Sequence, residues 1–163
     1  MRKIINEPKI KNPLIRAIRE LIEHRAIWLY VLCEEAAKKG LVWEDFAPNA
    51  IKRCGLSQGD HLVKKGRTQS LKGLKKTLFT KPAQWVFEMK IRECSDDFFS
   101  IDFHYCPLVK AWQKPGCSDD QIGRLGDIAM SGDRGIAESY GCVMDLPRAI
   151  ARGDDICEVR FRR

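Results

Sequence analysis

The chain has 163 residues and a formal charge of +7, with 29 Lys and Arg against 22 Asp and Glu. This length predicts one domain, residues 1–163, large enough to hold a core without metal or disulfide support. The hydrophobic fraction of 44% excludes a wholly disordered chain, and no apolar run approaches the ~18 residues of a membrane helix. Because the seven cysteines form no CxxC pair and no secretion signal is evident, we expect a cytoplasmic protein with free thiols.

The charge is divided unevenly along the chain. Residues 1–81 carry a net charge of +10, and residues 82–163 carry −3. We expect this division to separate a helical layer, residues 1–81, from a sheet-bearing half, residues 82–163, within the one domain.

Helical patterns fill the first half. Asn12-Pro13 predicts a helix start, after which apolar residues recur at helical spacing until Gly40. A shorter helix is predicted over residues 44–54, closing at Gly55.

A third helical stretch, residues 58–79, contains Gly66 and Gly73, which weaken it and can break it in two. Its segment 64–76 holds six cations and no acid. A solvated helix face and a rim that attracts phosphate or carboxylate both explain this pattern. No aromatic residues alternate with the cations, so the stacking platforms of single-strand binders are missing. A nucleic-acid accessory role is therefore the least favoured function.

After Pro82 the spacing of apolar residues changes from the helical period to a period of two, which is typical of strands. Residues 85–91 and 99–105 alternate apolar and polar side chains around a turn at Asp96-Asp97, which predicts an antiparallel hairpin with its apolar face on the helices. Helices are predicted over 108–113 and 119–140, and a last strand over 156–162. The fold class is α+β: a helical N-terminal half packed on a small antiparallel sheet, with a helical insertion before the last strand.

Three reactive residue types alternate at the end of the second predicted strand. Asp102, His104 and Cys106 fall on its polar side, which is the composition of an activated-nucleophile site. The competing interpretation is a solvated strand face, with Cys106 covered by the following helix. Cys106 alone is the better candidate, because backbone N–H groups at the strand-to-helix turn lower the pKa of a thiol.

Metal binding is another use of the same residues. His104 and Cys106, with Asp102 and one of Cys94, Cys117 or Cys157, supply four ligands. Their spacing matches no zinc pattern, so the sequence predicts no cofactor and leaves a divalent metal open.

Two further candidates lie later in the chain. Asp133, between Gly132 and Arg134 in a predicted helix, is either a surface carboxylate or a group directed into a pocket. Cys157 follows a Gly-Asp-Asp turn onto the apolar face of the last strand, where a buried core thiol is the competing interpretation.

The sequence Y-C-P-L at residues 105–108, G-D at 132–133 and A-I-A-R-G-D-D-I-C at 149–157 resembles the L-2-amino-thiazoline-4-carboxylic acid hydrolase family. The resemblance implies hydrolytic opening of a cyclic amidine to a carbamoyl-cysteine, with Cys106, Asp133 and Cys157 at the family-pattern positions. Two departures are Glu158, where the family often has Asp, and Gly126, near the place of a frequent cysteine.

On this hypothesis Cys106 is the nucleophile, His104 a general base or acid, and Asp133 polarises or protonates the amidine nitrogen. The predicted residues that bind a small anionic substrate are Arg134, Arg152, Asp102 and Cys157. The alternative is a non-catalytic small-ligand binding or sensor module on the same fold. We expect no membrane partner, and a homo-oligomer is left open.

Overall fold

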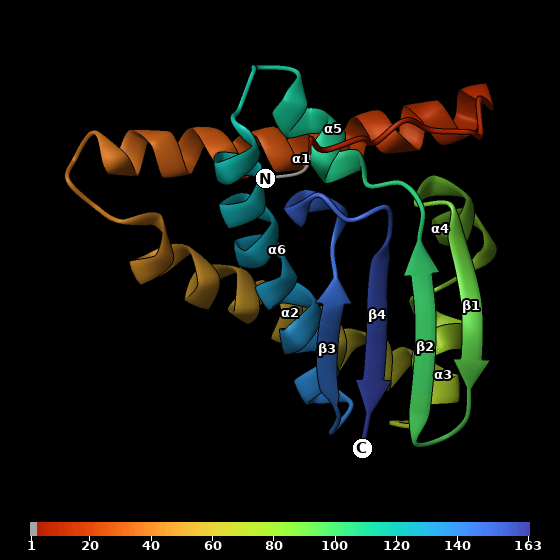
Figure 1. Ribbon diagram of the computed structural model, residues 1–163. Helices are drawn as coiled ribbons and strands as arrows, with labels where there is room; N and C mark the ends of the chain where they lie inside the picture. Colours follow the sequence, from red (N-terminus) through yellow and green to blue (C-terminus); the bar gives the residue numbers. More distant parts are fainter. Residues whose placement is uncertain (1–2) are drawn as a thin grey trace.

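The computed structural model describes residues 3–163 as an α+β fold, as the sequence predicts. Figure 1 shows the sheet on one side of the molecule, with α2 and α3 behind it and α1 crossing above the strands. In chain order the elements are α1 (Pro13–Ala37), α2 (Trp43–Gly66), α3 (Leu71–Thr77), α4 (Lys81–Val86), β1 (Met89–Cys94), β2 (Phe98–Phe103), α5 (Pro107–Gln113), α6 (Asp119–Ser139), β3 (Val143–Arg148), the 3-10 turn η1 (Ile150–Arg152) and β4 (Cys157–Arg162).

The four strands form one antiparallel sheet in the order β1-β2-β4-β3. The last strand therefore lies between the predicted hairpin and β3, an edge strand that the sequence analysis did not predict. Phe99 of β2 pairs with Phe161 of β4, and both rings are fully buried between the sheet and the helices. Pro147 lies in β3, where the pairing register shifts, as expected of an edge strand.

The predicted strand over residues 85–91 is wrong in its first half. Residues 81–86 form α4, because Pro82 is favoured in the first turn of a helix and the carbonyl oxygens of Trp85 and Val86 accept hydrogen bonds from Arg19. The strand begins only at Met89. The second strand of the hairpin ends earlier than predicted, at Phe103.

The predicted helix end at Gly55 is also wrong. α2 continues to Gly66, because Gly55 lies where α2 crosses α6 with the two backbones in contact. A Cβ atom at Gly55 would lie 1.9 Å from the carbonyl oxygen of Gly132. A Cβ at Gly135 would lie 2.5 Å from the carbonyl oxygen of Lys52. These glycines serve close packing rather than termination of the helix.

The third predicted helical stretch is broken in two. α2 ends at Gly66, Arg67 takes a left-handed conformation with φ of 53°, and α3 starts after the N-cap Ser70. The two helices predicted before the last strand are present as α5 and α6.

The N-terminal segment is held against the rest of the fold by a buried ion pair. Arg19 of α1 and Glu88, in the turn directly before β1, are 3.1 Å apart, and their side chains are 5% and 7% exposed. Glu88 also accepts hydrogen bonds from the backbone N–H groups of Lys9 and Ile10. Within residues 3–163, no helix is both long and apolar enough to cross a membrane.

Candidate functional site

Cys106 packs against the buried core that α1, α2, α5 and α6 form. It is the N-cap residue of α5 and is half-buried. Burial raises the pKa of its thiol to about 11, although the backbone N–H groups of Val109 and Leu108 oppose the rise. The hydrogen bonds expected at this strand-to-helix turn are present, but desolvation outweighs them, so the thiol is neutral at pH 7.

The N-terminal segment fixes the backbone of Cys106. Asn6 is 3% exposed, and its Nδ2 donates to the carbonyl oxygen of Cys106 at 2.8 Å. The N–H of Cys106 donates in return to Oδ1 of Asn6 at 2.9 Å. Nothing in the sequence distinguishes Asn6 from a surface asparagine, so its part in the site could not be predicted.

Asp133 projects from α6 into the same region. Burial raises the pKa of its carboxyl to about 6, against the opposing charges of Arg25 and Arg134. Its negative charge in turn raises the pKa of the Cys106 thiol. The thiol and the carboxyl therefore lie within electrostatic range of each other, and the carboxyl changes protonation state near neutral pH.

Cys157 completes the group at the start of β4. Burial, and then negative charge on Cys106, raise the pKa of the Cys157 thiol to about 12. Its sulfur accepts a hydrogen bond from the N–H of Ile150 at 3.3 Å. The structure thus brings together the three family-pattern positions, Cys106, Asp133 and Cys157, from α5, α6 and β4.

The prediction that Asp102, His104 and Cys106 share one strand face is wrong. β2 ends at Phe103, so only Asp102 lies in the strand. Asp102 is 3% exposed and forms an ion pair with Arg92. It lines a separate cavity of about 460 Å³, which Cys106 does not line. His104 follows the strand, and within residues 3–163 no hydrogen bond joins its imidazole to either residue.

The two predicted arginines differ in availability. Arg134 is exposed, and its positive charge lowers the pKa of Asp133. Arg152 donates to Asp127 Oδ1 at 3.2 Å and to the carbonyl oxygen of Leu146 at 2.6 Å, so its guanidinium is already engaged. Arg25 of α1, which the sequence analysis missed, is exposed and acts on Asp133 more strongly than Arg134 does.

A metal site is not evident in the described part of the chain. Among residues 3–163, no three His, Cys, Asp or Glu side chains are grouped so as to hold a metal ion. Of the additional cysteine ligands considered, Cys94 lies in β1, and Cys117 contacts Tyr30 instead.

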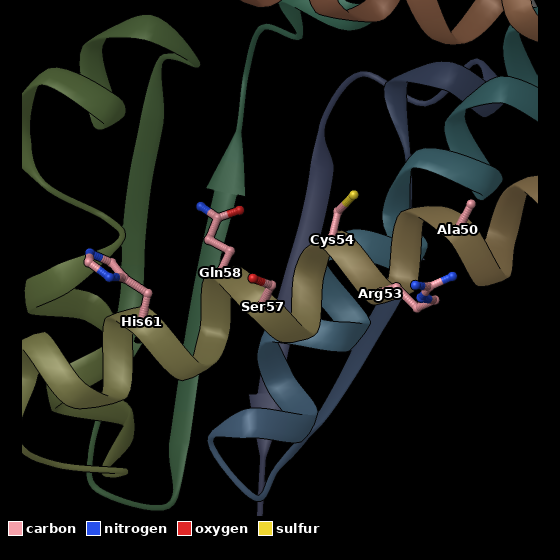
Figure 2. Close-up of a pocket in the computed structure, with 6 residues that line it drawn as sticks. All are labelled: Ala50, Arg53, Cys54, Ser57, Gln58 and His61. Atoms are coloured by element: carbon pink, nitrogen blue, oxygen red, sulfur yellow. The ribbon is translucent and has the colours of Figure 1, made fainter.

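An open cavity of about 820 Å³ lies on the outer face of α2. Figure 2 shows Cys54, Gln58 and His61 pointing to the same side of that helix, away from α6. Its lining comes from α2 alone, and it contains none of the predicted site residues. The basic segment 64–76 continues beyond it through α3, where Lys72 pairs with Asp96.

Fold and site together describe an α+β protein with a half-buried cysteine beside an aspartate of raised pKa. A sequence model of the L-2-amino-thiazoline-4-carboxylic acid hydrolase family matches residues 19–161, and the chain belongs to that family. No curated protein shows significant similarity to the chain.

Among the solved structures that share the fold is a trafficking protein particle complex subunit 3 from Naegleria fowleri, covalently bound to palmitic acid. The two chains are 16% identical with a TM-score of 0.54, over 86% of this chain and 93% of the other. At this identity the likeness concerns the fold alone.

Proposed function

We propose that the protein hydrolyses a cyclic amidine of the L-2-amino-thiazoline-4-carboxylate type at Cys106 and Asp133. The observation that carries this proposal concerns the Asp133 carboxyl. It has a pKa of about 6, and it lies within electrostatic range of the Cys106 thiol. A carboxyl with such a pKa can both accept and return a proton near pH 7.

The first step is attack by Cys106 on C2, the ring carbon bonded to both nitrogens and to sulfur. The Cys106 thiol gives its proton to Asp133, and the sulfur forms a bond to C2 while the π electron pair of the C=N bond moves onto nitrogen. That pair then re-forms the C=N bond as a ring bond at C2 breaks, and the ring atom that leaves takes the proton from Asp133. The ring is now open and attached to the enzyme through Cys106.

Substrate charge is needed for that attack. With a pKa of about 11, the resting thiol of Cys106 is neutral at pH 7. A protonated amidine beside the sulfur places a positive charge there and lowers the pKa of the thiol. The nucleophile therefore forms only with substrate bound, which protects Cys106 from unwanted reactions.

Water completes the reaction. Asp133 removes a proton from a water molecule that adds to C2, and the bond between C2 and Cys106 breaks. Cys106 regains its proton from Asp133, and the product is the carbamoyl-cysteine, one water heavier than the substrate.

The substrate carboxylate requires a cation near Asp133. Arg25 and Arg134 are exposed and close enough to affect the Asp133 charge. We assign the carboxylate to these two residues rather than to Arg152, which is held by Asp127 and Leu146. We leave His104 and Asp102 out of the mechanism because neither is joined to Cys106.

The test is turnover of L-2-amino-thiazoline-4-carboxylate by the purified protein, followed by mass spectrometry of the product. We expect Cys106→Ser and Asp133→Asn to lose activity, whereas Cys54→Ser and Asp127→Asn, at exposed positions, keep it. Absence of turnover by the wild-type protein, with and without added divalent metal, would falsify the proposal.

A second candidate is non-catalytic binding of a small ligand at the same site. The observation that favours it is the high pKa of both thiols, Cys106 and Cys157, which leaves neither reactive at rest. The trafficking subunit of the same fold holds palmitic acid. Isothermal titration with the thiazoline separates the two candidates, since a binding module returns the ligand unchanged.

A further inference from the structure

The outer face of α1 is apolar and uncovered within residues 3–163. Leu14, Leu21 and Trp28 follow one another at seven-residue spacing and are 69%, 74% and 64% exposed. The buried residues of α1, such as Ile15 and Ala26, lie on its opposite side. We call this face the α1 stripe: Leu14, Leu21, Trp28, Val31 and Leu32.

Single exposed apolar side chains are common on folded proteins, whereas five on one helix face form a continuous patch, which is typical of an interaction site.

The charges around the stripe indicate what kind of partner it fits. Arg16 and Arg25, which are exposed on α1, are balanced in number by exposed Glu20 and Glu35. Helices that lie on anionic lipid carry an excess of Lys and Arg beside the apolar face. This balance therefore favours a protein surface over a lipid one.

We propose that the α1 stripe binds the α1 stripe of a second copy of this chain, with the two helices antiparallel. A two-fold axis between Leu21 and His24 places Ala17 opposite Trp28 of the second copy, and Leu14 opposite Val31. The small side chain of Ala17, which is exposed on α1, thus faces the large side chain of Trp28. Small residues opposite large ones are how well-packed helices interdigitate.

The parallel arrangement lacks this complementarity, because it places Trp28 against Trp28 of the second copy. The antiparallel arrangement also brings opposite ends of the two helix dipoles together, which is favourable. α1 has 25 residues and is about 37 Å long. A pair of this length with Leu and Trp anchors corresponds to a small specific interface, roughly 600–800 Å² on each copy.

The test is analytical ultracentrifugation of the full chain over a range of concentrations. We expect a reversible dimer for the wild-type protein. Trp28→Glu and Leu21→Glu should weaken it on the order of thirtyfold, as for a central anchor residue. Val143→Glu, at a 58% exposed position on β3, is the matched control and should leave dimerisation unchanged. Circular dichroism checks that each variant is folded.

Disulfide cross-linking tests the orientation in a Cys54→Ser background. A mixture of Ala17→Cys and Trp28→Cys chains should form a mixed disulfide, whereas Leu14→Cys chains should not link to each other. A monomer at every concentration overturns the proposal, as does a dimer that survives Trp28→Glu. Trp28-dependent binding of a monomer to phosphatidylserine vesicles overturns it in favour of lipid. None of these outcomes depends on thiazoline turnover.

Discussion

Asn6 and Cys106 are joined by two reciprocal hydrogen bonds across a sequence separation of 100 residues. The amide of Asn6 satisfies both the N–H and the carbonyl oxygen of Cys106, where β2 has ended and α5 has not begun. A side chain from the N-terminal segment thus sets the backbone position of the proposed nucleophile.

Asn6→Ala should destabilise the protein and lower turnover. It leaves two half-buried backbone groups of Cys106 without partners, which costs about 1–3 kcal/mol. Urea denaturation measures the free energy of unfolding, and Gln58→Ala, on the exposed face of α2, is the control. Equal stability of Asn6→Ala and wild type would show that water replaces the lost bonds.

The Asp133 carboxyl should make stability fall as pH rises. Its pKa is about 6 in the folded protein and lower when unfolded, so the folded state binds the extra proton between about pH 4 and 6. The stabilisation is complete below that window and is lost as pH rises through 6. Asp133→Asn should therefore be more stable than wild type at pH 7, by about 3 kcal/mol.

Denaturant titrations at pH 4 and pH 7 measure this difference. Asp127→Asn, on the exposed side of α6, should keep the wild-type pH dependence. If Asp133→Asn and wild type lose stability in parallel between the two pH values, another group is responsible.

The same carboxyl should control activity in the opposite direction. As the proposed base, Asp133 must be charged in the free enzyme, so kcat/KM should rise through about pH 6 and then level off. Stopped assays at several pH values measure this profile with L-2-amino-thiazoline-4-carboxylate. A flat profile between pH 5 and 8 argues against Asp133 as the base.

Gly55→Ala should destabilise the protein by about 3 kcal/mol, because its Cβ would meet the carbonyl oxygen of Gly132 at 1.9 Å and the two helices must separate. Gly123→Ala on α6 is the control. Its Cβ would lie 3.6 Å from the nearest atom, so the better helix former should add about 0.5–1 kcal/mol. Thermal unfolding distinguishes these opposite signs.

Arg19→Ala should cost about 3 kcal/mol or more, because it leaves the Glu88 carboxylate buried without its ion pair. Arg16→Ala removes the same side chain one helical turn earlier, where its partner Glu20 is exposed, and should change stability by less than about 0.5 kcal/mol. Similar losses for the two variants would mean that the Lys9 and Ile10 N–H groups satisfy Glu88 without Arg19.

Much of the fold could be predicted because local patterns agree with tertiary structure. The Asn12 cap and the helical period predict α1, and the alternation around Phe99 predicts β2. Gly55 was misread because a glycine that ends a helix and one that admits another backbone look alike in sequence. β3 was not predicted because Pro147 interrupts its alternating pattern. The strand predicted from residue 85 starts later because Pro82, in the first turn of α4, favours a helix there.

The candidate site divides in the same way. Cys106, Asp133 and Cys157 were found through short motifs, and the structure places them within electrostatic range of one another. Asp102 and His104 were selected by strand alternation, which fails where β2 ends at Phe103. Arg25 and Asn6 could not be found, since both approach the site from segments far away in sequence.

The contact between Gly55 and Gly132 has a further consequence for the proposed base. Asp133 follows Gly132 directly, and the neighbour of Gly55 is Cys54, which faces the open cavity on the far side of α2. Side chains can take up a small displacement by changing rotamer, whereas two backbones in direct contact cannot. A displacement of α2 caused at its outer surface would therefore be transmitted to the Asp133 carboxyl and alter its desolvation, and with it the proton affinity.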